Sequence, residues 1–371
     1  MRIAYLCADD GIPLGGRKGA SVHLRSLSSA LARRGHQLLL ACRRTDGEDA
    51  TVAGFDVARL PAGDAQMAWL RGALREFRAD VLLERYSLST GPAPAVAAKL
   101  GIPYVLELNA PLVAEAIRHR GLWDPNGRLA ERERNLIATA GRIIVVSSAL
   151  AEHAVACGAA ATQVTVIPNG VDVAAFRNRD GRPVRERYGL SGVVIGFAGS
   201  LKPWHGVRAL VEATARMPAP VSLLIVGDGP EREAIREASR RLAPGQRAEL
   251  TGAVAHDRVP DFLAAMDIGA APFEPQPGFY FSPLKIAEYL AAGLPIVGTS
   301  QGDLPSMVGE AGVLVAPGNV SELSNAIDGL VREPSARARM SQAARRLAER
   351  MSWEHVAEKV EAVLAGEPVP A

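Results

Sequence analysis

Short apolar segments of strand length alternate with helical patterns from the first residues of the chain onward. Residues 3–8 form the first such segment, and Ala20, Leu24, Leu27 and Leu31 then recur on one face of a predicted helix. Repeated strand, helix and strand units build a parallel sheet that is covered by helices on both faces. The sequence therefore predicts the α/β class. Further strand-like segments follow at residues 38–41, 81–83, 104–108, 143–146 and 164–167.

A polar stretch at residues 177–183, rich in Arg, Asp and Gly, interrupts the alternation, which then starts again. A chain of 371 residues is long enough for two domains that each bury a full core. We predict a first domain at residues 1–176, a linker at 177–190 and a second domain at 191–352, with a helix near residues 353–364. The second set of strand-like segments comprises residues 193–198, 223–226, 268–271, 295–297 and 313–315.

Composition excludes several classes of protein. Hydrophobic residues make up 48% of the chain and charged residues 22%, which is typical of a soluble globular protein. The net charge of +2 is small, and aromatic residues do not alternate with basic ones, so nucleic acid is not an expected partner. The chain has no apolar run of about 18 residues and no signal-like start, which predicts a cytoplasmic protein.

Two further patterns bear on metals and membranes. Cys7, Cys42 and Cys157 form no Cys-x-x-Cys pair, so neither a disulfide framework nor a zinc site is expected. One predicted helix carries basic residues opposite an apolar stripe, which permits a weak peripheral membrane contact or simply a solvated face. Its basic residues are Arg71, Arg75 and Arg78, and its apolar stripe is Met67, Leu70, Leu74 and Phe77.

Ligands of open parallel sheets bind beyond the carboxyl ends of the strands, so the loops there are the candidate sites. The first loop, residues 10–21, contains Gly16 and Gly19 and leads into a helix, where backbone amides can approach a phosphate or where the chain simply turns. It lacks the Gly-x-Gly-x-x-Gly pattern of dinucleotide-binding dehydrogenases. The loop after residues 193–198 contains Ser200, Lys202 and His205. Lys202 and His205 would lie near a bound anion; alternatively, Lys202 is solvated and His205 caps the next helix.

Residues 278–288 are the sharpest feature of the second domain. Ser282 is the expected N-cap and Pro283 the first helical residue, which leaves the amides of Leu284 and Lys285 free for a phosphate. Glu288 lies further along the same apolar helix and needs a partner, for which two sugar hydroxyls or a salt bridge to Lys285 would serve. Tyr280 and Phe281 occupy the preceding loop and are expected to contact the same substrate.

Several motifs are absent from the sequence. It contains no Asp-x-Asp, His-Glu-x-x-His or clustered carboxylate motif, so we expect no bound metal and no cofactor. It also lacks the Gly-x-Ser-x-Gly elbow and the Walker loop, which removes the usual support for a hydrolase or a kinase.

The ordered set of loop motifs resembles glycosyltransferase family 4, the retaining enzymes with the GT-B fold of two facing Rossmann-like domains. The resemblance implies that Glu288 binds the ribose hydroxyls of a nucleotide sugar and that the amides of Leu284 and Lys285 hold its diphosphate. It implies further that Val254 meets the base, that Gly19 closes over the phosphates, and that a C-terminal helix within residues 353–371 crosses back to the first domain. The motifs that carry it are residues 166–172, 226–230, 282–289 and 292–297.

The chain departs from the family pattern at four positions. Tyr280 stands where the family commonly has a glutamate that contacts the donor sugar. Ser200 and His205 stand where it commonly has Arg and Lys, and Lys202 could replace that charge. Asn109, beside Glu107, takes the place of a histidine near the transferred sugar.

We therefore predict a retaining, hexosyltransferase-type glycosyltransferase that uses a UDP- or GDP-type sugar without a metal. Lys202 and His205 are the expected cations for the leaving diphosphate, while Asn109 and Glu107 position the sugar or an acceptor of unknown class. A nucleotide-sugar isomerase (epimerase) on the same fold and a noncatalytic nucleotide-sugar-binding protein stay open as alternatives.

Overall fold

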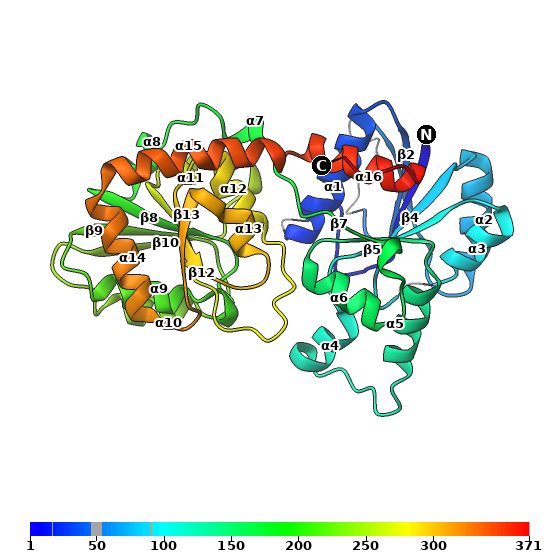
Figure 1. Cartoon of the computed structure of the whole chain (residues 1–371), viewed down its shortest axis with the longest axis horizontal. Coiled ribbons are helices and arrows are strands. Elements are labelled where there is room, and N and C mark those ends of the chain that lie inside the picture. Colours follow the sequence, from blue (N-terminus) through cyan, green and yellow to red (C-terminus); the bar gives the residue numbers. More distant parts are fainter. Residues whose placement is uncertain (17, 46–53, 90, 371) are drawn as a thin grey trace. The chain divides into compact units, whose positions relative to one another are not determined.

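The computed structural model describes residues 1–16, 18–45, 54–89 and 91–370, and it divides into two compact units (Figure 1). Unit 1 consists of Met1–Gly170, Tyr280–Ser282 and Trp353–Ala371. Unit 2 consists of Val171–Phe279 and Pro283–Ser352. Each unit has its own sheet and its own core.

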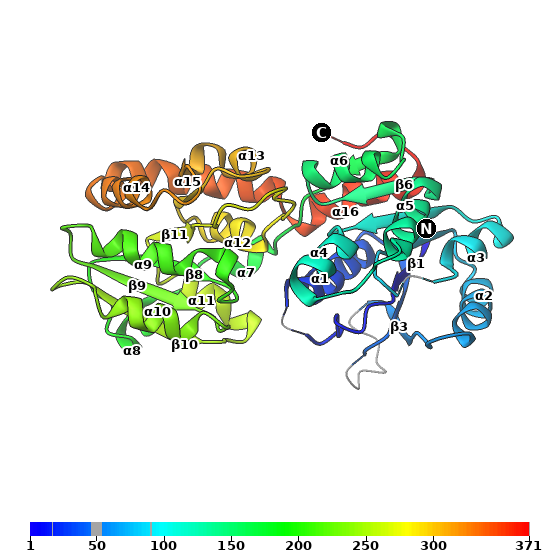
Figure 2. The same ribbon diagram turned by 90° about the horizontal axis from the view of Figure 1, so that it is seen from below.

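The described residues of unit 1 form a seven-stranded parallel sheet with the order β3-β2-β1-β4-β5-β6-β7. The chain moves along this sheet in opposite directions from β1 and from β4, so right-handed crossovers place α1 and α3 on opposite faces. Helix α1 packs against α16, and α2 packs against α3 (Figures 1 and 2). The strands are β1 (Arg2–Cys7), β2 (Gln37–Cys42), β3 (Asp56–Arg59), β4 (Val81–Arg85), β5 (Tyr104–Leu108), β6 (Arg142–Val145) and β7 (Val164–Val166).

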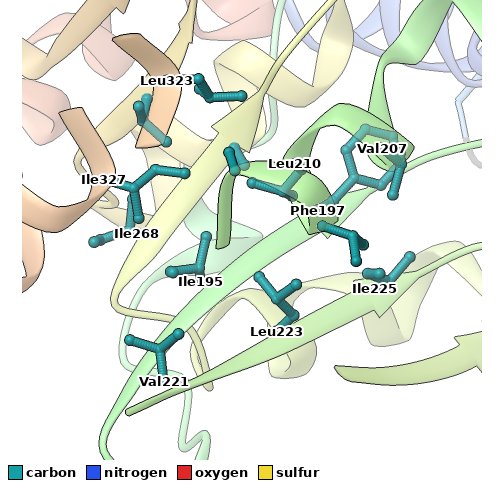
Figure 3. Packing of buried hydrophobic residues seen from close by; sticks show 14 of the residues in the cluster. Ile195, Phe197, Val207, Leu210, Val221, Leu223, Ile225, Ile268, Leu323 and Ile327 are labelled. Carbon is teal, nitrogen blue, oxygen red and sulfur yellow. The ribbon is translucent and has the colours of Figure 1, made fainter. Parts of the chain in front are cut away.

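Unit 2 contains, in its described part, a six-stranded parallel sheet with the order β10-β9-β8-β11-β12-β13. Aliphatic side chains of β8, β9 and β11 pack against α9 and α14, with Phe197 beside Val207, to form the core shown in Figure 3. The strands are β8 (Val193–Ala198), β9 (Val221–Val226), β10 (Arg247–Gly252), β11 (Ile268–Ala271), β12 (Ile296–Thr299) and β13 (Gly312–Val315).

Helices connect the strands in both units. Those of unit 1 are α1 (Gly19–Arg33), α2 (Ala65–Phe77), α3 (Ala93–Leu100), α4 (Leu112–Arg120), α5 (Arg128–Thr139), α6 (Ser148–Ala156) and α16 (Trp353–Ala365). Those of unit 2 are α7 (Val173–Phe176), α8 (Arg182–Arg187), α9 (Val207–Ala215), α10 (Arg232–Ser239), α11 (Val259–Leu263), α12 (Leu284–Ala292), α13 (Leu304–Val308), α14 (Val320–Arg332) and α15 (Pro334–Arg350).

The predicted α/β class with two parallel sheets is confirmed, and the segments at 193–198 and 268–271 match β8 and β11. Strands β3 and β10 are not among the strand-like segments predicted from the sequence. Both strands lie at the edge of a sheet and are half exposed or polar, so they lack the continuous apolar run of the central strands. Residues 177–190, expected to be a linker, include α8 and belong to unit 2.

The apolar stripe of α2, which was considered for membrane contact, packs into the core of unit 1. Leu70 and Leu74 are 2% and 3% exposed, whereas Met67 is 48% exposed. The arginines on the opposite face are exposed to solvent. Leu70 and Leu74 therefore serve the fold, and the weak peripheral membrane contact stays a prediction. None of the helices in the described ranges is long and apolar enough to cross a bilayer.

This packing predicts different effects for two neighbouring substitutions on α2. We expect Leu70→Ala to lower the free energy of unfolding by about 2–5 kcal/mol, because it leaves a cavity in the core. Met67→Ala, a matched control on the same helix, should change it by less than about 0.5 kcal/mol. Urea denaturation followed by tryptophan fluorescence measures both values. Equal effects of the two substitutions would show that the stripe is not packed as described.

Candidate functional site

The strand order of unit 2 reverses at β8, which has β9 on one side and β11 on the other. In open parallel sheets, the crevice outside the carboxyl ends of such strands is where ligands bind. The loop after β8 comprises residues 199–206, and the segment after β11 leads through Pro283 into α12. Several predicted site residues of unit 2, namely Ser200, Lys202, His205, Leu284, Lys285 and Glu288, therefore lie in these two loops or at the start of α12.

Two glycines bring the backbones of neighbouring loops together at this edge. Gly199 and Gly227 follow β8 and β9, and each has φ +141°, a conformation that favours glycine. A Cβ atom on Gly227 would come within 1.8 Å of the carbonyl oxygen of Gly199. The amide of Gly199 also donates to the carbonyl of Val226 at 2.9 Å. Only glycine permits this close approach, which leaves the backbone at the edge uncovered by side chains.

The ammonium of Lys285 is buried at the same edge without a hydrogen-bond partner. The residue is 9% exposed, and within the described part of the chain its Nζ atom has no such partner. Nζ lies 4.0 Å from the ring centroid of Phe197 and 5.1 Å from that of Phe273. It also lies 3.1 Å from the position that a Cβ atom of Gly199 would take. Burial lowers the pKa of Lys285 to about 7, although the Glu288 carboxylate opposes this shift.

Glu288 lies one turn further along α12. Burial raises the pKa of its carboxyl to about 7, against the opposing effect of the Lys285 charge. The Oε1 atom of Glu288 lies 3.9 Å from His256 Nδ1. The Glu288 side chain is 14% exposed. The alternative predicted from the sequence, a salt bridge between Glu288 and Lys285, is therefore not the contact that this carboxylate makes.

His205 is held neutral beside these groups. Its Nδ1 atom lies 2.5 Å from the carbonyl oxygen of Ser200, and its ring packs against Phe197 and Phe273. Burial lowers the pKa of His205 to about 3, helped by the charges of Lys285 and Lys202. A buried imidazole beside two ammonium groups is unprotonated near pH 7, so the role of His205 at the leaving diphosphate stays a prediction. The helix α9 that follows begins after Gly206, so His205 does not cap it.

Lys202 and Ser200 flank His205 on the more accessible side of the loop. Lys202 is partly exposed, with Nζ 5.7 Å from the ring centroid of Trp204. Ser200 is exposed, and its carbonyl also accepts from the amide of Lys202 at 3.0 Å. Val254 lies two residues beyond β10 and is half buried. Lys202 is thus an accessible cation of this edge, and Lys285 is a buried one.

The start of α12 differs by one residue from the expectation. Pro283, and not Ser282, is the N-cap, and Leu284 is the first helical residue. Ser282 belongs to unit 1, where its Oγ atom accepts from the amide of Asn169 at 3.0 Å, so it cannot cap the helix. The first amides of α12 still lack intrahelical partners, as at every helix start.

Tyr280 and Phe281 also belong to unit 1, where their rings contact each other with centroids 4.4 Å apart. The Tyr280 hydroxyl donates to Glu115 at 2.9 Å, and its carbonyl accepts from the Ser147 hydroxyl at 2.8 Å. Where the family commonly has a sugar-binding glutamate, this chain therefore has Tyr280, which is hydrogen-bonded to Glu115 of α4.

Glu107, at the end of β5, is the centre of a buried polar cluster in unit 1. Its carboxylate accepts from Tyr5 and contacts His23 Nε2, each at 2.5 Å, and Arg85 lies 3.7 Å away. Burial raises the pKa of Glu107, but the charges and hydrogen bonds of His23, Arg85 and Tyr5 outweigh it and lower the pKa to about 2. The sequence analysis missed these partners because they are up to 102 positions away along the chain.

Asn109 and the first loop complete the predicted residues of unit 1. The Asn109 amide donates to Glu107 at 3.3 Å, while its Oδ1 atom has no hydrogen-bond partner among the described residues. Gly19 is the first residue of α1, and Arg25 donates to the carbonyl of Gly16 at 2.8 Å. A Cβ atom on Gly16 would lie 2.5 Å from Ser21 Oγ, so this part of the loop is closely packed.

Two family models match the chain over complementary regions. Residues 17–175 match the model described as Glycosyltransferase Family 4. Residues 192–333 match the model described as Glycosyl transferases group 1. The chain belongs to glycosyltransferase family 4. The family assigned by resemblance is confirmed, and with it the conclusion that the protein is a glycosyltransferase.

Characterised relatives span nearly the whole chain. It is 27% identical over 381 residues to a glycogen synthase of Mycobacterium tuberculosis, covering 91% of this chain and 89% of that protein. It is 28% identical over 375 residues to a D-inositol 3-phosphate glycosyltransferase of Segniliparus rotundus, covering 92% of this chain and 82% of the relative.

Solved structures share the two-domain GT-B fold. The Anabaena protein Alr3699/HepE in complex with UDP has a TM-score of 0.75 at 22% identity, over 99% of this chain and 100% of that chain. A sucrose-phosphate synthase from Thermosynechococcus elongatus has a TM-score of 0.77 at 19% identity, over 99% of both chains. At these identities the likeness concerns the fold.

The Glu107 cluster predicts a pH-dependent contribution to stability. Because the pKa of Glu107 is lower in the folded chain than its usual value near 4.3, the ionised carboxylate stabilises the fold above that pH. Glu107→Gln leaves Arg85 without its carboxylate, and we expect a loss of about 3–5 kcal/mol near pH 7. The difference from wild type should shrink as the pH falls from about 4.5 to 2.

Chemical denaturation at a series of pH values measures this difference. Glu354→Gln is the matched control, since Glu354 pairs with Arg33 at 2.7 Å with its side chain 59% exposed. We expect that control to change the stability by at most about 1 kcal/mol. An equal loss for both variants at pH 7 would contradict the interpretation of Glu107.

Proposed function

We propose that the protein transfers a hexosyl group, with retention at the anomeric carbon, from a UDP- or GDP-type sugar to an acceptor hydroxyl, without a metal. The observation that carries the proposal is the buried ammonium of Lys285 at the carboxyl edge of the unit 2 sheet, which has no hydrogen-bond partner within the described residues. An isolated buried charge is unfavourable, so it calls for an anionic partner. The diphosphate of a nucleotide sugar supplies one.

Three kinds of group converge on that diphosphate in the proposal. Lys285 Nζ lies 3.1 Å from the position that a Cβ atom of Gly199 would take, so the glycine lets the ammonium approach the loop backbone closely. The free amides of Leu284 and Lys285 add the positive end of α12. Lys202, partly exposed on the loop after β8, contributes a second cation. The side-chain charge therefore comes from two lysines, in place of the Arg and Lys common in the family.

The other end of the nucleotide is assigned to Glu288 and Val254. A carboxylate in the first turns of a helix that already binds a diphosphate can accept hydrogen bonds from two ribose hydroxyls through its two oxygens. Such hydroxyls would stabilise the ionised form of Glu288 and so lower its raised pKa. Val254, beyond β10, is proposed to contact the base. The solved structures of Alr3699/HepE with UDP and with UDP-glucose favour UDP as the first nucleotide to test.

The proposed reaction breaks the bond between the anomeric carbon and the diphosphate oxygen, and forms a bond from that carbon to the acceptor oxygen on the same face. The electron pair of the broken bond goes to the diphosphate, where the lysines and helix amides stabilise the developing charge. The acceptor proton goes to the leaving diphosphate, so the enzyme needs no separate general base. Asn109, whose Oδ1 atom lacks a partner, is proposed to position the sugar or the acceptor.

Donor binding is the first test. We expect one nucleoside diphosphate and its sugar, from a panel of UDP, GDP and ADP derivatives, to raise the unfolding temperature, because a ligand stabilises the state that binds it. Lys285→Met and Glu288→Ala should remove that shift, whereas Lys99→Met, at an exposed lysine of α3, should keep it. A shift unchanged in Lys285→Met would contradict the role given to its ammonium.

Turnover is the second test, measured as nucleoside diphosphate released in the presence of a panel of acceptors. We expect Glu288→Ala and Lys202→Ala each to lower kcat/KM at least ~100-fold, the scale of losing a charged contact to the transition state. The rate should be the same with added Mg²⁺ and with a chelator. Nuclear magnetic resonance of the product should show the anomeric configuration of the donor.

Three outcomes would overturn parts of this proposal. Near-normal turnover in both variants would exclude the assigned site, and turnover that is lost in the chelator and restored by added Mg²⁺ would show that a metal takes part. Conversion of the donor without an acceptor would favour a nucleotide-sugar isomerase, and tight donor binding without turnover on any acceptor would favour a noncatalytic binding protein.

A further inference from the structure

Helices α5 and α6 of unit 1 bring together three metal-ligating side chains that the proposed reaction does not use. Glu133 lies on α5 and His153 lies on α6. Cys157 is the C-cap residue of α6. His153 and Cys157 are four residues apart, a spacing that places both on one helical face. One oxygen, one nitrogen and one sulfur atom of the three lie within 4.8 Å of one another.

A single nitrogen faces both other groups. His153 Nε2 lies 3.2 Å from Glu133 Oε1 and 3.7 Å from Cys157 Sγ. A ring nitrogen either donates or accepts a hydrogen bond, so it cannot receive the thiol proton and also donate to the carboxylate. With hydrogen bonds alone, the two contacts must therefore share the single proton or the single lone pair of this nitrogen.

A metal ion satisfies all three groups at once. Zinc lies about 2.0–2.1 Å from nitrogen and oxygen ligands and about 2.3 Å from sulfur. In a tetrahedron, those bonds separate nitrogen from oxygen by about 3.3 Å and nitrogen from sulfur by about 3.6 Å. The observed separations of 3.2 and 3.7 Å are close to both values. The two separations that involve His153 Nε2 thus fit ligands of one tetrahedral ion, and the oxygen and sulfur atoms lie within 4.8 Å of each other.

The surroundings orient the carboxylate and give access to it. Glu133 Oε2 accepts from the Tyr86 hydroxyl at 2.7 Å and from the amide of Val113 at 3.3 Å, so Oε1 is the oxygen that points to His153. Such hydrogen bonds to the outer atom of a ligand are usual around bound metals. A cavity of about 270 Å³ lined by Tyr86 and Glu133, together with the 28% exposure of the His153 side chain, provides a route for the ion.

We propose that Glu133, His153 and Cys157 bind one Zn²⁺ ion, with a water molecule as the fourth ligand, and that the ion braces α5 against α6. The set of one carboxylate, one imidazole and one thiolate suits zinc, and the thiol proton is released to solvent on binding. The site lies in unit 1, outside the proposed donor site, so its expected effect is on stability. This proposal differs from the prediction of no zinc site, which rested on the spacing of the cysteines. Cysteine spacing does not reveal a carboxylate that comes from another helix.

Metal content tests the proposal directly. After equilibrium dialysis of the untagged full chain against micromolar Zn²⁺, elemental analysis should find one ion per chain. Glu133→Gln, His153→Gln and Cys157→Ser should each weaken binding at least ~100-fold, and Tyr86→Phe, which keeps all three ligands, about 10-fold. His355→Gln is the matched control, because His355 also pairs with a glutamate, Glu358, at 3.5 Å but has no thiol beside it. That control should bind as wild type does.

Two further readouts distinguish zinc coordination from a hydrogen-bonded network. Co²⁺ in place of zinc should show a thiolate-to-metal absorption band that is absent in Cys157→Ser, and zinc should protect Cys157 from thiol reagents. Zinc at 100 times its dissociation constant should raise the unfolding temperature of the wild type by about 5 °C. A full site should hold ~1 ion per chain. The proposal would be overturned by less than ~0.2 ion per chain, or by equal zinc binding in wild type and Cys157→Ser.

Discussion

Parallel pairing of buried strands is the constraint on which the rest of this protein depends. Each parallel pair needs a crossover, and a right-handed crossover returns every loop after a strand to the same edge of the sheet. In unit 2 this rule alone brings the loop after β8 beside the segment that leads from β11 into α12. Lys202 and Lys285, which are more than 80 positions apart in the chain, thereby lie in segments that follow neighbouring strands at one edge of the sheet.

The two units differ in how their buried charged side chains are hydrogen-bonded. In unit 1, Glu107 is surrounded by His23, Tyr5 and Arg85, and its charge is stabilised within the protein itself. In unit 2, Lys285 is also buried, but its ammonium lies over two aromatic rings and has no hydrogen-bond acceptor among the described residues. A charge that the fold satisfies contributes to stability, whereas a charge that the fold leaves unsatisfied is available to a ligand. This contrast is the physical basis for placing the donor diphosphate in unit 2.

Departures from the family pattern become understandable at the same edge. The Arg and Lys positions of the family hold Ser200 and His205 here, and His205 is neutral because it lies between aromatic rings and next to two lysines. Positive charge is nevertheless present, since Lys285 enters from α12. The glutamate position that holds Tyr280 is likewise linked to a carboxylate, that of Glu115, through the tyrosine hydroxyl. In both cases a neighbouring side chain brings a charge of the same sign close to the altered position.

The sequence by itself determined the α/β class, the two sheets and the family, because buried parallel strands are continuous apolar runs and the loop motifs are local in the chain. It also located Glu288, Leu284 and Lys285 on one helix. Only the tertiary structure decided which atoms carry charge: that Lys285 is unpartnered, that His205 is neutral, that Ser282 bonds Asn169 instead of capping α12, and that Glu133 joins His153 and Cys157. Those properties depend on desolvation and on contacts between residues distant in the chain, and local sequence patterns do not encode either.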